Sequence, residues 1–262
     1  MSRANWDDLA VRMGVGLALA AVGLFTVIAG GNWFHAFVTI AAGLMVWELV
    51  RMASPGQDTM AISLGLLSAF ALTLGFFLPL GMMLPLLFAP ALVGFGQLRA
   101  GRYQFAIYSV AILIAAFGLA HVRDDFGVTW MLWLALVVIV TDVAGYFAGR
   151  FLGGPKFWPR ISPKKTWSGT VAGWIGAAIV AGIFMAQTGA GASLIGISVA
   201  VAMASQLGDV AESALKRKAG VKDSSQLLPG HGGLLDRFDG MLGAALFLLL
   251  IEQAVSFPPV AL

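Results

Sequence analysis

Long apolar runs dominate this chain, and short polar stretches separate them. The runs lie near residues 10–30, 33–50, 59–76, 78–95, 104–121, 129–148, 169–187, 191–209 and 237–256. A helix needs about 20 apolar residues to cross a bilayer, so the pattern predicts nine transmembrane helices. Pro79, Gly81 and Pro85 indicate a tight hairpin within the tract 59–95. Unbroken apolar runs also exclude a transmembrane β-barrel, whose strands alternate in polarity over about ten residues.

Composition supports the same fold class. Hydrophobic residues make up 59% of the chain and charged residues 11%, whereas a soluble domain has about 25% charged residues. We therefore expect an all-α integral membrane protein, a polytopic helical bundle. No internal repeat or linker is visible, so residues 1–262 are predicted to form one membrane domain, with N-terminal spans in 1–128 and the candidate chemistry in 129–262. The absence of cysteine excludes disulfides and Cys-ligated metals.

The basic residues fall on one side of the predicted membrane. Nine spans would place fifteen of the 16 Lys and Arg residues on that side, and Arg123 alone on the other. Five of the fifteen lie in the 150–165 loop and five in the 213–237 loop; the rest are Arg3, Arg12, Arg51, Arg99 and Arg102. Because cytoplasmic loops carry the excess of Lys and Arg, we expect a cytoplasmic N-terminus, cytoplasmic polar loops and an outside C-terminus.

Two carboxylates mark adjacent helix ends on the predicted cytoplasmic face. Asp209 ends the eighth span and Asp236 begins the ninth, so both side chains are candidates to share one divalent cation. Mg²⁺ typically takes one or two protein carboxylates and completes its shell with waters and substrate phosphates. The alternative is that each acid pairs with a nearby Lys or Arg at the interface.

Asp142 lies near the cytoplasmic end of the sixth span, where a carboxylate needs a partner, a cation or a water-filled cavity. Tyr146 and Arg150 follow on the same helical face. A structural Asp142–Arg150 link is the alternative to a functional role.

The next loop is rich in groups that bind phosphate: Ser162, Lys164, Lys165 and Thr166. Thr166 or Ser168 is placed to cap the seventh helix, whose first N–H groups would then face an anion. The spacing is not that of a P-loop. The alternative is a solvated basic loop attracted to anionic lipid headgroups.

The turn at residues 229–233, Pro-Gly-His-Gly-Gly, directly precedes Asp236. Its glycines allow the backbone to approach a phosphate or a metal-bound ligand closely. Elsewhere, Glu48 and Arg51 are most simply an i,i+3 pair. The polar inventory as a whole, with acids for a metal and lysines, hydroxyls and glycine turns for phosphates, points to phosphoryl-type transfer at bilayer level, with a lipid as one substrate.

A longer pattern runs through the same region. It comprises Ser213-x-x-Lys216-Arg217, Lys222-Asp223, the 229–233 turn and Asp236-Arg237-Phe238-Asp239. This pattern resembles the signature of the phosphatidate cytidylyltransferases (CDP-diacylglycerol synthases). The segments around Asp142, Tyr146 and Arg150 and around residues 162–166 are also similar to that family.

The resemblance implies that CTP and phosphatidate give CDP-diacylglycerol and pyrophosphate, with Mg²⁺ required, for phospholipid biosynthesis in the cytoplasmic (inner) membrane of a bacterium. It implies metal-binding roles for Asp209 and Asp236 and catalytic roles for these two acids, Ser213 and Lys216. The alternative for Lys216 is a solvated Lys216-Arg217-Lys218 cluster. The expected substrate-binding residues are Asp142, Tyr146, Arg150, Ser162, Lys164, Lys165, Thr166, Arg217, Lys222, Asp223, His231, Gly232, Gly233, Arg237 and Asp239.

The resemblance further implies a homodimer and a monovalent cation such as K⁺ beside the Mg²⁺, and we expect no nucleic-acid partner. Two other functions stay open from the residues. One is a CTP-dependent enzyme acting on another lipid phosphate, for example an archaeal ether lipid, because lipid preference resides in generic apolar helices. The other is an ion-coupled transporter using Asp142 and Asp209, although the visible charges lie at one face and no repeat is present.

Overall fold

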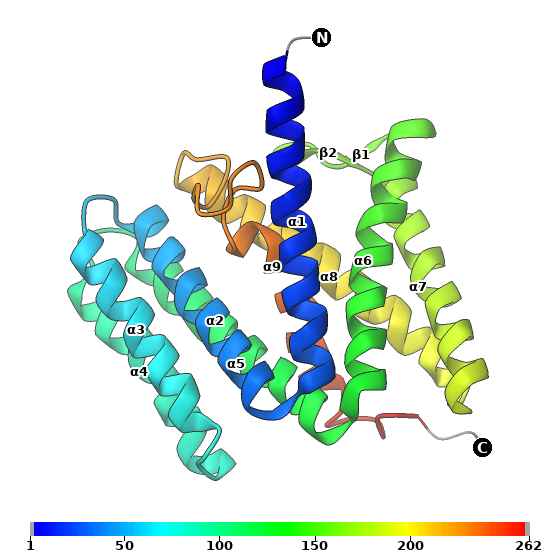
Figure 1. Ribbon diagram of the computed structural model, residues 1–262, viewed down its shortest axis with the longest axis horizontal. Coiled ribbons are helices and arrows are strands. Elements are labelled where there is room, and N and C mark those ends of the chain that lie inside the picture. Colours follow the sequence, from blue (N-terminus) through cyan, green and yellow to red (C-terminus); the bar gives the residue numbers. More distant parts are fainter. Residues whose placement is uncertain (1–2, 260–262) are drawn as a thin grey trace. The chain divides into compact units, whose positions relative to one another are not determined.

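The computed structural model describes residues 3–259, with side chains for all of these except residues 3–12 and Leu80. Helices account for most of this range, and one pair of short strands interrupts them (Figure 1). The elements are α1 (Arg3–Ala29), α2 (Gly31–Ala53), α3 (Asp58–Gly75), α4 (Leu80–Gln97), α5 (Arg102–Asp125), α6 (Gly127–Phe151), β1 (Lys156–Trp158), β2 (Ser162–Thr166), α7 (Trp167–Thr188), α8 (Ser193–Lys218) and α9 (Leu235–Ile251).

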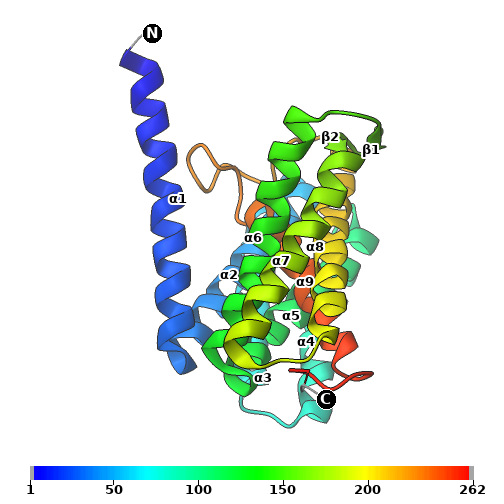
Figure 2. The same cartoon turned by 90° about the vertical axis from the view of Figure 1, so that its right-hand side faces the viewer.

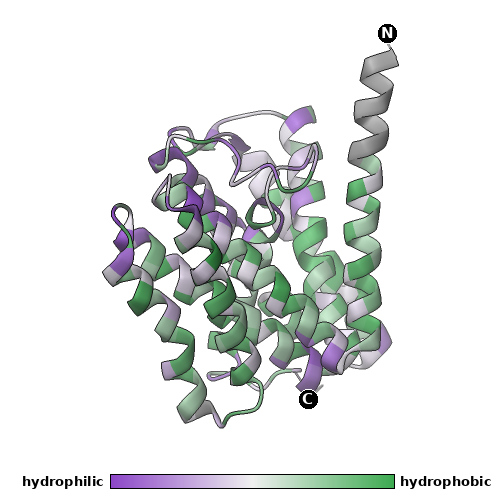
Figure 3. Ribbon diagram, turned by 60° about the vertical axis from the view of Figure 1, so that its left-hand side comes forward, coloured by the Kyte–Doolittle hydropathy of each residue, from purple (hydrophilic) through white to green (hydrophobic). Residues whose placement is uncertain are grey.

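Each of the nine predicted apolar runs coincides with a helix in the described range, which confirms the helical fold class. Among the residues that the structure describes, six helices are long and apolar enough to cross a membrane, namely α2, α3, α5, α6, α7 and α8. Shorter apolar segments lie at Met13–Ala29 and Gly81–Gln97. Apolar residues cover the lengths of the helices, while hydrophilic residues gather at helix ends and connecting segments (Figure 3). These are the features of a multi-pass membrane protein.

Two local features differ from the sequence prediction. Helix α8 does not end at Asp209 but continues to Lys218, so Asp209, Ser213 and Lys216 share one rigid element. The segment predicted as an irregular loop forms an antiparallel hairpin, in which Lys156 pairs with Thr166 and Trp158 with Ser162. Strand β2 leads directly into α7 and so carries its lysines on a fixed backbone.

The chain divides into two compact units. The first contains the residues up to Ala120 together with Lys218–Phe238, and the second contains His121–Arg217 together with the residues from Asp239 onward. The single membrane domain, with its division near residue 128, stays a prediction.

In the first unit, small residues set the spacing between α2 and α3, which lie side by side (Figure 1). A Cβ atom at residue 65 would lie 2.8 Å from the carbonyl oxygen of Gly43. The described core of this unit is mainly apolar, with Phe34, Leu49 and Phe105 almost fully buried, although Ser68 and Ser109 are buried as well. One fully buried acid, Glu48 on α2, stands out against it.

In the second unit, α6 and α7 pack along most of their length (Figure 2). A Cβ atom at residue 169 would lie 2.5 Å from the carbonyl oxygen of Gly145, so the two backbones are in direct contact. Helices α8 and α9 repeat this arrangement, since a Cβ atom at residue 243 would lie 2.3 Å from the carbonyl oxygen of Ala204. Small residues at helix contacts are the usual device for packing helices in a bilayer, where apolar lipid supplies no hydrophobic drive for association.

Candidate active site

A pocket of about 480 Å³ lies in the second unit. It is bounded by the C-terminal half of α6, strand β2, the first turn of α7 and the middle of α8. Its lining residues are Thr141, Asp142, Gly145, Tyr146, Gly149, Arg150, Lys164, Lys165, Thr166, Gly169, Thr170, Gln206 and Asp209. The structure thus brings together seven of the residues predicted from the sequence to form the site.

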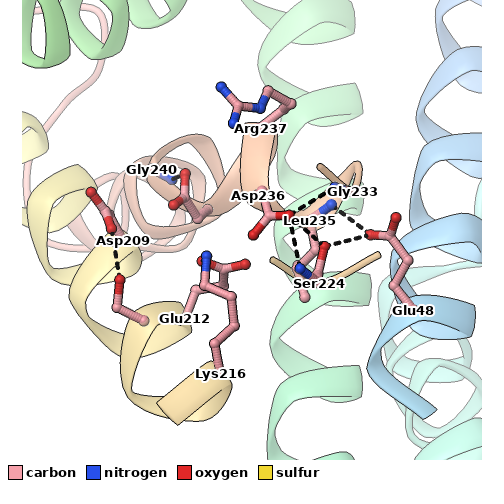
Figure 4. A network of polar contacts seen from close by, with 12 residues as sticks. Glu48, Asp209, Glu212, Lys216, Ser224, Gly233, Leu235, Asp236, Arg237 and Gly240 are labelled. Atoms are coloured by element: carbon pink, nitrogen blue, oxygen red, sulfur yellow. Dashed lines mark hydrogen bonds and ion pairs between the residues drawn. The ribbon is translucent and has the colours of Figure 1, made fainter. Parts of the chain in front are cut away.

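Asp209 has a partner on each carboxylate oxygen. Lys165 Nζ lies 2.5 Å from Oδ2, and Ser213 Oγ donates a hydrogen bond of 3.2 Å to Oδ1 (Figure 4). The Lys165 and Asp209 side chains are 24% and 29% exposed. The alternative predicted for Asp209, an ion pair with a nearby lysine, is therefore present, and the lysine is Lys165 of the β1–β2 hairpin. The pair forms part of the pocket wall, so it does not exclude a role in chemistry.

Tyr146 and Arg150 form a second polar pair on the pocket wall. Arg150 Nη1 donates a hydrogen bond of 2.8 Å to the Tyr146 hydroxyl. Asp142, one turn before Tyr146 on α6, also lines the pocket. All three side chains predicted to share one helical face thus border the same cavity.

Thr166 caps α7, as the sequence predicts. Its Oγ1 accepts a hydrogen bond of 3.2 Å from the backbone N–H of Gly169. Ser168 Oγ donates instead to the Gly153 carbonyl, at 2.5 Å. These hydroxyls fix the hairpin to the helix, and Lys164, exposed on β2, is left facing the pocket. Ser162, at the other end of β2, pairs with Trp158 and lies outside the lining set.

The C-terminal part of α8 holds a buried ion pair. Lys216 Nζ contacts a carboxylate oxygen of Glu212, and the Lys216 side chain is only 12% exposed. Arg217, in contrast, is exposed. The alternative of a solvated Lys216-Arg217-Lys218 cluster therefore does not fit Lys216. On α9, Asp239 Oδ1 accepts a hydrogen bond of 2.7 Å from the N–H of Gly240.

Asp236 lies in the first unit, at the start of α9. Its Oδ2 accepts three hydrogen bonds: from Ser224 N at 2.9 Å, from Ser224 Oγ at 2.9 Å and from Gly233 N at 2.7 Å (Figure 4). The carboxylate is thereby held by the loop that precedes it.

The glycines of that loop are required by carboxylates of this chain. Gly232 has a φ of 82°, and a Cβ atom there would lie 2.7 Å from Asp236 Oδ2. A Cβ atom at residue 233 would lie 2.5 Å from Glu48 Oε1. The predicted close approach thus exists, and what approaches the backbone is a carboxylate. Arg237 Nε donates to the His231 carbonyl at 3.1 Å, which closes the turn onto α9.

Lys222 and Asp223, in contrast, are exposed at the start of this loop. They are not among the described residues that line the pocket, and they donate no hydrogen bond to Asp236. Their substrate-binding roles stay predictions.

Glu48 is not an i,i+3 partner of Arg51. Arg51 Nε pairs with Asp58 Oδ1 at 3.4 Å, while Glu48 is fully buried and bonds to the loop before α9. The simple pairing was wrong because Arg51 pairs with Asp58 instead, while hydroxyl and backbone donors from the loop before α9 reach the buried Glu48 carboxylate.

Comparison with known proteins shows the family of this chain. The model of the cytidylyltransferase family matches residues 10–255, which is nearly the whole chain. The chain belongs to the cytidylyltransferase family. It is accordingly an enzyme, a nucleotidyltransferase, and the resemblance seen in the signature residues is confirmed.

Several curated relatives of this cytidylyltransferase are named phosphatidate cytidylyltransferase. One from Brucella suis is 37% identical over 97% of both chains. One from Bacillus subtilis is 33% identical over 93% of this chain and 97% of its own. One from Helicobacter pylori is 41% identical over 55% of this chain and 57% of its own.

Two buried acids of this cytidylyltransferase were not predicted from the sequence as candidate functional residues. Glu48 and Glu212 are each at most 2% exposed. Glu48 interrupts an apolar run, and an ionisable residue within a span is a functional candidate by default. That signal was present, but the neighbouring Arg51 offered a simpler partner. Gln206, which lines the pocket and accepts from Trp174 Nε1 at 3.0 Å, carried no such signal.

Proposed function

We propose that this cytidylyltransferase transfers a cytidylyl group from CTP to phosphatidate, releasing pyrophosphate and forming CDP-diacylglycerol. The observation that carries the proposal is the pocket of the second unit. It gathers three cationic side chains, those of Arg150, Lys164 and Lys165, with the carboxylates of Asp142 and Asp209. The names of the relatives supply the substrates.

The pocket suits the triphosphate of a nucleotide. Its volume of about 480 Å³ lies within the roughly 300–1,000 Å³ of small-molecule sites. Transfer at phosphorus depends mainly on positioning and on neutralising charge. Lys164 and Lys165 are carried on a strand, and Arg150 is joined to Tyr146, so the three cations enter the reaction already ordered. In this scheme the Lys165 ammonium group contacts both the Asp209 carboxylate and a phosphate of CTP.

The lipid phosphate is assigned to the C-terminal part of α8. Ser213 and Lys216 follow Asp209 on the same helix, so a hydroxyl and an ammonium group lie within about two turns of that carboxylate. In the proposed reaction an oxygen of the phosphatidate phosphate forms a bond to the α-phosphorus of CTP. The bond from that phosphorus to the bridging oxygen breaks, and pyrophosphate leaves with the electron pair.

The donor set fits Mg²⁺. In the described part of the chain no group of three or more His, Cys, Asp or Glu side chains is arranged to hold a metal. Mg²⁺ does not need such a cage, because it is commonly bound by one or two carboxylates and by substrate phosphates. We propose Asp209 and Asp236 as its protein ligands, and K⁺ as a second cation. Bound Mg²⁺ would neutralise phosphate charge and orient the phosphates.

We further propose nine spans, a cytoplasmic N-terminus and active site, and a homodimer in a bacterial inner membrane. The distribution of basic residues supports the orientation, and the relatives from Brucella and Bacillus support the bacterial membrane. The predicted outside location of the C-terminus concerns residue 262, which lies outside the described residues, as do the side chains of Arg3 and Arg12.

A direct assay tests the function. Purified protein in detergent is incubated with radiolabelled CTP, phosphatidate and Mg²⁺, and label is followed into the lipid phase. We expect lipid-soluble label that depends on phosphatidate and is lost in Asp209→Asn. A phosphate-bearing ether lipid is assayed in parallel. Label with the ether lipid alone would replace phosphatidate as the substrate, and no label with either would overturn the proposal.

A further inference from the structure

Glu48 is a buried acid without an assigned role. It lies in α2 with 0% of its surface exposed. Three donors from the loop that ends in α9 reach its carboxylate: Ser225 Oγ at 2.6 Å, Leu235 N at 2.7 Å and Leu234 N at 2.8 Å. Ser224 Oγ also lies within hydrogen-bond distance, at 3.3 Å. A buried carboxylate needs such donors to offset its lost hydration.

Two of those donors belong to the start of α9. The first N–H groups of a helix have no acceptor within the helix, and here Leu234 and Leu235 donate theirs to Glu48. A carboxylate at this position also interacts favourably with the positive end of the helix dipole. Glu48 therefore caps α9 from a different helix, far away in the sequence.

The same loop holds Asp236. Ser224 Oγ lies 2.9 Å from Asp236 Oδ2 and 3.3 Å from Glu48 Oε2. A hydroxyl has one proton to donate, and the shorter distance assigns it to Asp236. Gly233 N donates to Asp236, while the next two N–H groups donate to Glu48. Neighbouring N–H groups of one short segment thus bond to two different carboxylates, with Gly232 and Gly233 leaving room for both.

We propose that Glu48 is a positioning residue, which fixes the rotation and depth of Asp236 by anchoring residues 224–235 and capping α9. The proposal rests on the proposed function in one respect, the role of Asp236 as a metal ligand. Glu48 itself makes no contact with substrate in this scheme. Glu48 acts through the loop. Its substitution should therefore lower the affinity for the metal more than it lowers kcat at saturating Mg²⁺.

The test uses the full-length protein in detergent with two matched variants. Glu48→Gln keeps the size of the side chain but turns an NH₂ group toward backbone donors. Asp58→Asn removes an acid of the same unit that is 72% exposed and pairs with Arg51. Three quantities are measured: amide hydrogen exchange of residues 224–238, Mn²⁺ affinity by electron paramagnetic resonance, and the Mg²⁺ concentration for half-maximal turnover.

We expect Glu48→Gln to speed exchange of the Leu234 and Leu235 amides by about tenfold or more, because these two N–H groups lose their carboxylate acceptor. We also expect about tenfold weaker Mn²⁺ binding and a matching rise in the Mg²⁺ requirement, with a smaller change in kcat at saturating Mg²⁺. Asp58→Asn should match the wild type throughout. Unchanged exchange in Glu48→Gln would overturn the anchoring, and faster exchange with unchanged metal affinity would overturn the positioning role.

Ser225→Ala keeps the proposal testable if Glu48→Gln does not fold. It removes the 2.6 Å donor to Glu48 and the acceptor of the Leu227 N–H, but leaves both backbone donors to Glu48 in place. It should shift the same three quantities in the same direction by a smaller factor. The exchange and Mn²⁺ measurements do not depend on the substrates. A wild-type protein inactive toward CTP and phosphatidate would refute the proposed function, while these two measurements would still decide the role of Glu48.

Discussion

Lys165 on the β1–β2 hairpin and Asp209 on α8 form an ion pair of 2.5 Å on the wall of a shared pocket. Because neither side chain is more than about a third exposed, the pair ties the hairpin to the helix that carries the proposed catalytic residues. The neighbouring Lys164 differs from Lys165 in that its side chain is exposed. The two lysines should therefore respond differently to substitution.

Lys164→Ala should raise the KM for CTP or for phosphatidate by about tenfold to a hundredfold, since a charged hydrogen bond contributes about 1.5–3 kcal/mol. Lys165→Ala should also reduce kcat, because it frees the hairpin and leaves Asp209 without its cation. Both are measured in mixed micelles in which phosphatidate is the only anionic lipid. If the lysines serve only the bilayer surface, Lys164→Ala will be indistinguishable from wild type there.

Asp209→Ala and Asp236→Ala should each reduce turnover by about a thousandfold or more, because a site that neutralises triphosphate charge loses a ligand of its cation. Circular dichroism and size-exclusion chromatography should show folded protein. Asp58→Asn serves as the control for loss of an acid. Near-normal activity of Asp236→Ala at ordinary Mg²⁺ concentration would remove that residue from the site.

Lys216→Arg should be severely impaired. Its side chain is 12% exposed and pairs with the buried Glu212, so a broad planar guanidinium does not fit where a compact charge does. Ser213→Ala should cause a smaller but still measurable loss of activity, since it removes one hydrogen bond to Asp209. The readouts are kcat and the KM for phosphatidate, with exposed Lys218→Arg as control. Wild-type kinetics in Lys216→Arg would exclude Lys216 from the chemistry.

Gly169→Ala should destabilise the protein by about 1–3 kcal/mol, the usual cost of overpacking, because its Cβ would lie 2.5 Å from the Gly145 carbonyl. Gly182→Ala on the same helix has open space around the added methyl and should be neutral or slightly stabilising. Thermal unfolding in detergent measures both. Equal unfolding temperatures for the two variants would contradict the backbone contact between α6 and α7.

Single cysteines in this cysteine-free chain test the topology. Arg160→Cys and Ser225→Cys should react with an impermeant maleimide only from the cytoplasmic side, and Leu262→Cys only from outside. The wild type provides the background, since it contains no cysteine. Finding positions 160 and 225 on opposite sides would contradict a single cytoplasmic site.

The sequence predicted the helices well because bilayer-spanning runs are read from composition alone. It placed the end of α8 too early, since the amphipathic stretch from Asp209 to Lys218 loses hydropathy without losing helicity. The Thr166 cap followed from its position before an apolar run. The partners of Glu48 could not be predicted, because they lie more than 170 residues further along the chain and two of them are backbone N–H groups, whose positions no residue type reveals.

The length of α8 has a consequence for the membrane in which the enzyme works. Its 26 residues extend about 39 Å, more than the roughly 30 Å of the hydrocarbon layer. Asp209, Ser213 and Lys216 lie on the C-terminal part of this one rod, so their depth cannot adjust independently of the apolar part. A thicker or thinner bilayer changes the tilt of such a helix and with it the height of these groups relative to the lipid phosphates. Acyl-chain length in the host membrane would then tune catalysis without any contact between the chains and the reacting atoms.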